Sequence, residues 1–597
     1  MNNIPQRLAA LRKEMKQQHI AAFITTGSDP HGSEYFADHW KEMEWISGFT
    51  GEAGTALILH DHAFIWTDSR YYLQAGQQLK DTGFELMRDG EMTTPSIPKY
   101  LTSNLKEGDI VGINPELFSN HAFTNIQSQL AEYGIKLQSA DLIGKLWTTD
   151  RPSISTSPLY AYDEKYAGLG VADKLALVRE KMKEERADTL ITAALDEIAW
   201  LLNIRGTDVE FNPVVISYLI LDRQSCTLFV APEKLTSETL QYFIHHKIAV
   251  SDYLNIYAAI RLIEPEQTVL FDGSKLNRAL YEAIPQSCKK IDKQTPIVLL
   301  KARKNNVELD GERAAMIKDG VALTRFFMWV EQAVAKDNLT EYDLGLKLKG
   351  FRAEQENFVE ESFGSIVGYQ GNGAIVHYEA PEQGSALVKP TGMLLVDSGG
   401  QYLEGTTDIT RTICLDTPTE QMIHDYTLVL KGHLALAQAR FPYGTRGSQL
   451  DALAHQFLWQ EGLSYGHGTG HGVGHFLCCH EGPQNIRMNE NPAILETGMV
   501  LSDEPGIYRT DQWGIRIENL ITVVPAEKTD FGEFLKFETL TLFPYESRLI
   551  DFSMLDRKDI DWINTYHRHV YNTLAPHLKP EEQKWLREKT KDICHSC

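Results

Sequence analysis

The chain has 597 residues and carries 81 acidic against 58 basic side chains, which gives a net charge of −23. This length is enough for about three or four domains, and a hydrophobic fraction of 43% is ordinary for a soluble globular protein. The acidic balance argues against nucleic acid or an anionic membrane as the main partner.

The N-terminal segment MNNIPQRLAALRKEMKQQHI is polar and charged, and it lacks the apolar core of a signal peptide. No uninterrupted apolar run reaches about 18 residues, so we expect no membrane span. The seven cysteines are scattered and suggest no disulfide framework. The tail CHSC, Cys594 to Cys597, has the spacing of a redox or metal site but no second pair. Together these features predict a cytoplasmic protein.

Two segments of the N-terminal half resemble each other: RLAALRKEMKQQHIAAFITT from Arg7 and KLALVREKMKEERADTLITA from Lys174. Each has the pattern of an amphipathic helix followed by a short β-branched strand. At an offset of 167 residues the identical pairs include Leu8 and Leu175, Ala9 and Ala176, Arg12 and Arg179, Met15 and Met182, and Ile24 and Ile191. The repeat predicts two related α/β domains, residues 1–155 and 156–303, with a linker rich in Pro and Ser between them.

Residues 304–597 change in character. Helices are predicted over 308–336, 339–356, 418–441 and 448–462. Short apolar strands separated by glycine turns are predicted in GAIVHYEAP, GMLLVDSGGQYLEGTTDITRTICL, GMVLSDEPGIY and GIRIENLITVV. The pattern fits an α+β catalytic domain, with a helical extension from about 545 that packs on the body or on another subunit.

Four carboxylates lie in or beside these apolar strands: Asp397, Asp408, Glu504 and Glu518. Burying an unpaired charge is costly, so each of them needs a partner. Four in one domain, close to a histidine cluster, indicate a shared cation. A hairpin between Asp397 and Asp408 would bring both carboxylates to one face.

The histidine cluster lies in YGHGTGHGVGHFLCCHEGP, residues 465–483. His471 and His475 have the i, i+4 spacing of a zinc protease helix, but the glycines between them and the missing Glu argue against a helix. The glycines instead allow extended backbone to approach a crowded site. One imidazole with four carboxylates suits two divalent metal ions, and an oxygen-rich site favours manganese over structural zinc. Two such ions can activate a water for attack on a carbonyl group.

The phrases VDSGGQYLEGTTDITRT, GHGTGHGVG, SDEPGIY and GIRIEN resemble those of the pita-bread metallopeptidases. The closest resemblance is to the aminopeptidase P family, the Xaa-Pro aminopeptidases, in its large three-domain cytosolic form. It covers nearly the whole chain and implies two related N-terminal domains, similar to the creatinase N-terminal domain, followed by a pita-bread catalytic domain. It also implies two divalent ions per chain, most readily Mn²⁺, a homodimer, and peptide substrates with proline in the second position.

The resemblance assigns metal ligands residue by residue. Asp408 and Glu518 would bridge two metal ions, Asp397 would complete one site, and His471 with Glu504 would complete the other. Tyr508 and Arg516 would orient these carboxylates.

It also assigns the groups that act on the substrate. Glu504 would pass protons to and from the attacking water, and His480 would steady the tetrahedral intermediate. His377 would contact the substrate near the scissile bond, and His467 would line the proline pocket. Catalysis is therefore expected from His480, Glu504 and His377.

Three residues depart from the family pattern: His475, Cys478 and Cys479. We expect His475 to be a packed neighbour of the site and not a ligand, and we expect plain buried roles for the cysteines. Two alternative functions remain open, a prolidase-like Xaa-Pro dipeptidase and a metal-less binding module on the same fold. The presence of all five ligands argues against the second.

Overall fold

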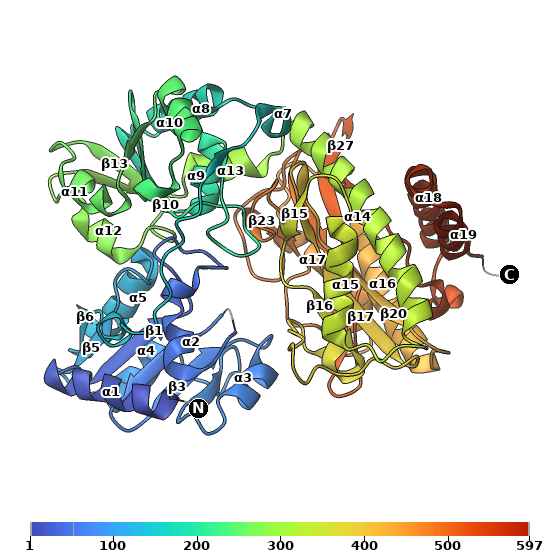
Figure 1. Ribbon diagram of the computed structural model, residues 1–597, viewed down its shortest axis with the longest axis horizontal. Helices are drawn as coiled ribbons and strands as arrows, with labels where there is room; N and C mark the ends of the chain where they lie inside the picture. Colours follow the sequence, from blue (N-terminus) through green and yellow to red (C-terminus); the bar gives the residue numbers. More distant parts are fainter. Residues whose placement is uncertain (1–2, 52, 595–597) are drawn as a thin grey trace. The chain divides into compact units, whose positions relative to one another are not determined.

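A computed structural model describes residues 3–51 and 53–594, and the chain divides into two compact units (Figure 1). Unit 1 comprises residues 1–164 and 169–298, and unit 2 comprises 165–168 and 299–597. The domain boundaries expected near residues 155 and 303 stay predictions. Among the described residues, no helix has both the length and the apolar character needed to cross a bilayer. The predicted CHSC tail lies outside the described residues beyond Cys594.

Unit 1 contains two six-stranded sheets with the same topology. Their strand orders are β4-β3-β2-β1-β5-β6 and β12-β11-β10-β8-β13-β14. In each sheet a central strand, β1 or β8, pairs antiparallel with one neighbour and parallel with the other. The two α/β halves expected from the sequence repeat are thereby confirmed.

The strands of the first sheet are β1 Ala22–Thr26, β2 Thr55–Leu59, β3 Ala63–Thr67, β4 Glu85–Arg88, β5 Ile110–Ile113 and β6 Lys136–Ser139. Those of the second are β8 Thr189–Thr192, β10 Ser217–Asp222, β11 Cys226–Val230, β12 Ala249–Ser251, β13 Thr268–Phe271 and β14 Lys289–Asp292. The helices are α1 Ile4–Gln17, α2 Glu42–Ser47, α3 Tyr72–Gln78, α4 Ile97–Asn104, α5 Asn120–Ala131, α6 Ile143–Leu146, α7 Glu164–Ala167, α8 Val171–Glu184, α9 Leu195–Leu202, α10 Ser237–His245, α11 Ile256–Arg261, α12 Arg278–Ala283 and α13 Pro296–Ala302.

The sequence repeat corresponds to a structural repeat, because the same face of the first long helix is buried in both halves. In α1 the buried apolar side chains are Ile4, Leu8, Leu11 and Met15, and in α8 they are Val171, Leu175, Val178 and Met182. Each residue of the second set lies 167 positions after its counterpart in the first. The spacing of three and four residues places each set on one helical stripe, and that stripe is buried in both halves.

Unit 2 consists of antiparallel sheets with helices packed along them. Figure 1 shows the long α14, which packs beside α15, while α16 packs beside α17. The main helices are α14 Asn306–Ala333, α15 Glu341–Ala353, α16 Glu420–Ala437 and α17 Asp451–Trp459. They confirm the four predicted helices to within a few residues at each end.

The strands of unit 2 form three larger groups and a hairpin. Their orders are β15-β18-β19, β16-β17-β20, β21-β28-β27-β24-β22-β23 and β25-β26. The bounds are β15 Phe358–Glu361, β16 Ile366–Tyr369, β17 Met393–Ser398, β18 Gly400–Tyr402, β19 Gly405–Thr406, β20 Ile409–Cys414, β21 Arg440–Pro442, β22 Gly470–Gly472, β23 Glu481–Ile486, β24 Val500–Asp503, β25 Gly506–Arg509, β26 Trp513–Arg516, β27 Asn519–Thr529 and β28 Gly532–Thr539.

One predicted strand is wrong. GAIVHYEAP forms the end of a 3₁₀ helix, Gln370–Ala374, followed by a turn, and the strand of this region is β16 just before it. The segment is held by side chains and not by a sheet ladder. The Glu341 carboxylate accepts hydrogen bonds from Tyr378 Oη at 2.7 Å and Asn372 Nδ2 at 3.0 Å. A buried acceptor with several donors replaces the backbone pairing that an apolar run usually makes.

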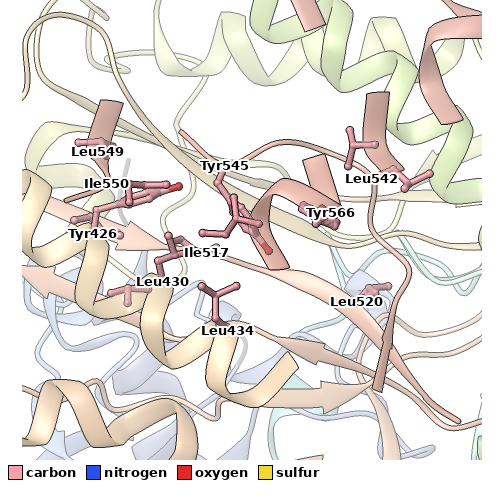
Figure 2. Close-up of a cluster of buried hydrophobic side chains, with 14 of the residues drawn as sticks. Tyr426, Leu430, Leu434, Ile517, Leu520, Leu542, Tyr545, Leu549, Ile550 and Tyr566 are labelled. Carbon is pink, nitrogen blue, oxygen red and sulfur yellow. The ribbon is translucent and has the colours of Figure 1, made fainter. Parts of the chain in front are cut away.

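The C-terminal helices α18 Arg557–Leu574 and α19 Pro580–Lys589 belong to the body of unit 2. Figure 2 shows the buried cluster in which Tyr566 of α18 and Tyr545 meet Leu430 and Leu434 of α16. Ile517 lies in the same cluster, directly before Glu518. The apolar packing of the C-terminal region therefore supports the backbone that carries a predicted metal ligand.

Candidate metal centre

Two paired strands carry the first two carboxylates. Asp397 lies in β17, and Asp408 directly precedes β20. The strands pair antiparallel, with Asp397 opposite Thr410. The connection between them is longer than a simple hairpin because β18 and β19 pair with each other in another sheet. The expectation that strand pairing brings Asp397 and Asp408 to one place is met by this longer route.

Three neighbouring strands of the six-stranded sheet carry the other ligands. His471 lies in β22, Glu504 directly follows β24, and Glu518 directly precedes β27. β24 pairs antiparallel with both neighbours, and Asp503 lies opposite Asn519. The end of one strand and the start of the next therefore place Glu504 and Glu518 at the same edge.

These residues meet in one cluster. Ligand atoms of Asp408, His471 and Glu518 all lie within 4.8 Å of one another. His471 Nε2 is 3.3 Å from Asp408 Oδ2 and 3.5 Å from Glu504 Oε1. Thr410 Oγ1 donates a hydrogen bond to Glu518 Oε2 at 2.7 Å, which ties the two sheets together at this point.

The electrostatics of the cluster are those of a site built for cations. Burial raises the pKa of Glu504 to about 7, and burial with the charge of Asp408 raises the pKa of Glu518 well above its usual range. Burial also raises the pKa of Asp397, although Arg516 opposes the shift. Burial acts in the same direction on Asp408, but the hydrogen bond and charge of His471 bring the pKa of Asp408 below its ordinary value. Four carboxylates repel one another here until positive charge compensates them.

The donor set fits divalent metal ions. Asp397 Oδ1 is buried and has no hydrogen-bond partner among the described residues, so it is available as a ligand atom. Carboxylate oxygens with one imidazole match the preference of manganese and similar ions. The cluster therefore has both the charge and the free oxygen atoms that a pair of cations needs.

A chain of hydrogen bonds connects the predicted substrate residue His467, and the backbone just before His377, to a predicted ligand. His467 Nε2 is 2.7 Å from Tyr508 Oη, which accepts a hydrogen bond from Arg516 Nη1 at 2.8 Å. Arg516 Nη2 donates to Asp397 Oδ2 at 2.6 Å and to the carbonyl oxygen of Val376, the residue before His377, at 3.4 Å. The Arg516 guanidinium thus holds three groups: the Asp397 carboxylate, the Tyr508 hydroxyl that contacts His467, and the backbone just before His377.

Comparison with known proteins agrees with this arrangement. The profile of the metallopeptidase family M24 matches residues 310–525, and its C-terminal region matches 533–593. Creatinase/prolidase N-terminal domain profiles match residues 7–144 and 150–308.

Similar proteins extend over the full length. Xaa-Pro aminopeptidase 1 of Dictyostelium discoideum is 39% identical and is aligned over 99% of this chain and 97% of its own. A probable Xaa-Pro aminopeptidase P of Laccaria bicolor is 38% identical over 98% and 93%. The chain belongs to the Xaa-Pro aminopeptidase family. A solved structure is similar as well: the crystal structure of X-prolyl aminopeptidase from Caenorhabditis elegans, which is described as a cytosolic enzyme with a di-nuclear active site. It superimposes on the present chain with a TM-score of 0.94 and 33% sequence identity, and the alignment covers 98% of this chain and 99% of that one.

In this member of the Xaa-Pro aminopeptidase family, His480 lies beside the cluster. Its ring packs edge-on against that of His471, with centroids 4.2 Å apart. Cys479 Sγ donates a hydrogen bond to Asp408 Oδ2 at 3.2 Å. Burial and the charge of Asp408 raise the pKa of Cys479, so this group is a thiol donor.

His475 has protein partners on both ring nitrogens: Nδ1 is 3.1 Å from Glu312 Oε1 and Nε2 is 3.1 Å from the carbonyl oxygen of Tyr166. This agrees with the interpretation of His475 as a packed neighbour. Sequence reasoning missed Thr410 and Cys479 as partners of ligands. The only signal for Thr410 was its position two residues after Asp408 in a strand, which places both on one face.

Proposed function

We propose that this chain is a dimetal Xaa-Pro aminopeptidase, which hydrolyses the peptide bond between an N-terminal residue and a following proline. The observation that carries the proposal is the convergence of Asp408, Glu504, Glu518 and His471 from separate strands on one cluster, to which Arg516 links Asp397 through hydrogen bonds to Asp397 and Thr410. Full-length similarity to proteins named Xaa-Pro aminopeptidase supports the substrate class.

In this proposal Asp397, Asp408, His471, Glu504 and Glu518 would hold two divalent ions, with Asp408 and Glu518 shared between them. Manganese is the proposed metal because oxygen ligands predominate. When bound, the ions would supply Lewis acidity toward the scissile carbonyl group and make a water more acidic.

The residues of the chain supply the proton transfers and the positioning. Glu504, with Oε1 3.5 Å from His471 Nε2, would pass a proton from the attacking water to the leaving nitrogen. His480, whose ring packs edge-on against that of His471, would donate to the oxygen that gains negative charge. Arg516 and Tyr508 keep Asp397 and His467 in position through their hydrogen bonds.

Recognition of proline rests on ring shape, because the nitrogen of an Xaa-Pro bond carries no hydrogen. We propose that His377 and His467 edge an apolar pocket for this ring. Proline buries two more side-chain carbons than alanine, which stabilises it by about 1.6 kcal/mol, or roughly fifteenfold in kcat/KM. Stronger selectivity requires a penalty on the amide hydrogen of other residues, such as burial without an acceptor.

The further proposals concern partners and place. We infer that the partners are peptides with proline in the second position and a second copy of the chain in a homodimer, with no role for nucleic acid or a membrane. A cytoplasmic location is proposed, and it is supported by the description of the C. elegans relative as cytosolic.

A tripeptide assay tests the function. The protein is stripped with a chelator, reloaded with Mn²⁺, and offered Xaa-Pro-Xaa, Xaa-Ala-Xaa and the dipeptide Xaa-Pro, with metal content measured alongside. We expect two metal equivalents, rapid cleavage of Xaa-Pro-Xaa alone, and no activity in the stripped protein. Cleavage of the dipeptide only would make it a prolidase-like enzyme. Metal-free protein with full activity, or absence of both metal and activity, would overturn the proposal.

A further inference from the structure

The loop Val473–Cys479 with His480 connects β22 to β23 and lies almost wholly inside unit 2. Only Cys478 and His480 are partly exposed, and the other residues are buried. Gly472 pairs with Glu481 at the base of the loop. The backbone of Gly474 donates to the carbonyl oxygen of Cys478 at 2.9 Å, which closes the loop on itself. The loop is therefore compact, and the Gly472–Glu481 pair brings its two ends together at the sheet. It carries Cys479 and His480 beside the metal-ligand cluster, by which we mean the predicted ligands Asp397, Asp408, His471, Glu504 and Glu518.

The backbone of this loop is not in a relaxed conformation. Phe476 has a φ of 47°, in the left-handed region that a bulky side chain rarely adopts. A Cβ on Gly474 would lie 2.8 Å from both the Cys478 carbonyl oxygen and Glu481 Oε2, so the turn tolerates no side chain there. Such a backbone persists only where its surroundings hold it firmly. The groups that hold this loop are two buried polar anchors.

The first anchor is Glu481, the residue directly after His480. Lys301 Nζ is 2.5 Å from its Oε2, and Lys304 Nζ is 2.8 Å from its Oε1. The exposed fractions of these three side chains are 2%, 1% and 0% for Lys301, Lys304 and Glu481. Since removing one partner from a buried ion pair leaves an uncompensated charge, both lysines constrain where the carboxylate can lie.

The second anchor is His475, in the middle of the loop. Its ring lies between Glu312 Oε1 of α14 and the Tyr166 carbonyl oxygen, 3.1 Å from each. Glu312 Oε1 also lies 3.4 Å from the backbone nitrogen of Thr406, two residues before Asp408. The same carboxylate thus contacts the loop and the strand segment that leads to a metal ligand.

We propose that Glu481 and His475 are positioning residues that fix His480 and Cys479 against the metal-ligand cluster. Neither touches the substrate. They act through the loop, because Glu481 adjoins His480 in the chain and Cys479 donates to Asp408. The inference rests on the proposed aminopeptidase function and adds to it two anchors on which the rate depends.

The first test is a double-mutant cycle with Mn²⁺-loaded protein and an Xaa-Pro-Xaa substrate. Glu481→Gln preserves shape and removes the charge that the two lysines bind. We expect two metal equivalents to remain, KM to change by less than about threefold, and kcat to fall at least about tenfold. His480→Ala combined with Glu481→Gln should be within about twofold of His480→Ala alone, since both act through one group. Fully additive losses, or an unchanged kcat in Glu481→Gln, would overturn the proposal.

His475→Gln provides the same cycle if Glu481→Gln does not fold, because it leaves the ion pairs intact. Lys304→Met should lower kcat, and Lys304→Arg should lower it less, since arginine keeps the positive charge beside Glu481. A matched control is the buried pair Lys234 and Asp208 in unit 1, with Nζ and Oδ1 2.5 Å apart and both side chains 1% exposed. Asp208→Asn should lower thermal stability and leave kcat unchanged.

The second test does not depend on activity. Cys479 is 1% exposed, whereas Cys478 is partly exposed. Under native conditions iodoacetamide should modify Cys478 in the wild type and leave Cys479 unmodified, as read from fragment masses. Glu481→Gln and His475→Gln should raise the rate of Cys479 modification at least about fivefold, while the buried Cys414 of β20 stays unmodified. Asp208→Asn should leave Cys479 protected.

The two tests separate this inference from the proposed function. If the wild type does not cleave Xaa-Pro-Xaa, the proposed function fails. The rate of Cys479 modification in the Glu481 and His475 variants then decides alone whether these residues fix the loop. If the wild type cleaves it while both anchor variants keep normal kcat and a protected Cys479, only the positioning inference fails.

Discussion

Arg516 donates hydrogen bonds to several side chains of the candidate site, including one predicted metal ligand. Its guanidinium donates to Asp397 Oδ2 at 2.6 Å, to Tyr508 Oη at 2.8 Å and to Thr410 Oγ1 at 3.2 Å. Asp397 and Glu518 both depend on this geometry, the second through Thr410. A planar fork with five donors can hold three acceptors at once, and a lysine ammonium on a flexible stem cannot match that arrangement.

We therefore expect Arg516→Lys to weaken binding of at least one metal ion by about 10- to 100-fold, as is typical when a ligand loses its orienting partner. Calorimetric titration of stripped protein with Mn²⁺ measures the change. The control is Arg509→Lys, since Arg509 makes a comparable fork to Asp425, with Nε and Nη2 at 2.5 and 2.8 Å, outside the cluster. Equal affinity in wild type and Arg516→Lys would contradict the assignment.

The individual ligands make a separate prediction. Asp408→Ala and Glu518→Ala each remove an oxygen donor from the centre of the cluster, so each variant should lose at least one metal equivalent and more than about 99.9% of its turnover. His480→Ala should keep both equivalents and lose rate, because its ring lies beside His471 and is not in the predicted ligand set. Metal analysis together with kcat checks this, and loss of metal from His480→Ala would make His480 a ligand.

At the scale of elements, sequence periodicity predicted the helices well because their buried stripes repeat every three or four residues. The buried faces of α1 and α8 are examples. It failed at GAIVHYEAP, where an apolar run suggested a strand. The Glu341 carboxylate holds that segment through Tyr378 and Asn372, and such a contact between distant residues leaves no local signature.

In the candidate site, too, some features could be predicted from the sequence and others could not. Its carboxylates were visible because charges inside apolar strands are rare, and the resemblance gave them roles. Their supporting contacts were not visible. Lys301 and Glu481 are 180 positions apart, and neither lies in a pattern that distinguishes a buried ion pair from a solvated charge. Tertiary packing alone decides which charges meet.

Helix α18 carries a prediction of its own. His567 is buried in it, and its Nε2 accepts a hydrogen bond from the backbone of Tyr545 at 3.2 Å. Burial, reinforced by the charge of Arg411, lowers the pKa of His567 to about 3. The unfolded chain binds this proton near pH 6.5, so the native state loses about 1.4 kcal/mol per pH unit below that value, down to about pH 3.

We expect the unfolding free energy of metal-free wild type, relative to His567→Gln, to fall by about 2 kcal/mol between pH 6.5 and pH 5. Glutamine keeps an acceptor for Tyr545 but does not titrate. Urea unfolding at each pH measures the difference. His569→Gln, at an exposed position of the same helix, is the control variant. A constant difference for His567→Gln would show that this histidine is not buried in its neutral form.

At the scale of the whole molecule, the sequence repeat predicted two α/β halves but not that they form one contact unit. Long-range contacts join them. Asn277 Nδ2 donates to the Pro30 carbonyl oxygen at 2.8 Å, and His31 Nδ1 lies 2.9 Å from the Ala193 carbonyl oxygen. The partners of each pair lie far apart in the sequence, and only Ala193 of these four residues belongs to a repeated segment. The metal-ligand cluster lies entirely in the other unit, between β17 and β27.

Because the metal-ligand cluster lies in unit 2 alone, bound metal should change the thermal stability of the two units differently. Ions that bind only the folded form of unit 2 stabilise that unit by RT ln(1 + [M]/Kd), which is about 2.7 kcal/mol for each site at a metal concentration of 100 Kd. We expect calorimetry of stripped protein to show two unfolding transitions, of which Mn²⁺ raises one by several degrees and leaves the other within about one degree. Asp408→Ala should remove most of the shift without changing the insensitive transition. If both transitions moved together, or a single transition carried the whole shift, the two units would unfold as one cooperative body, and the metal centre would stabilise all of it.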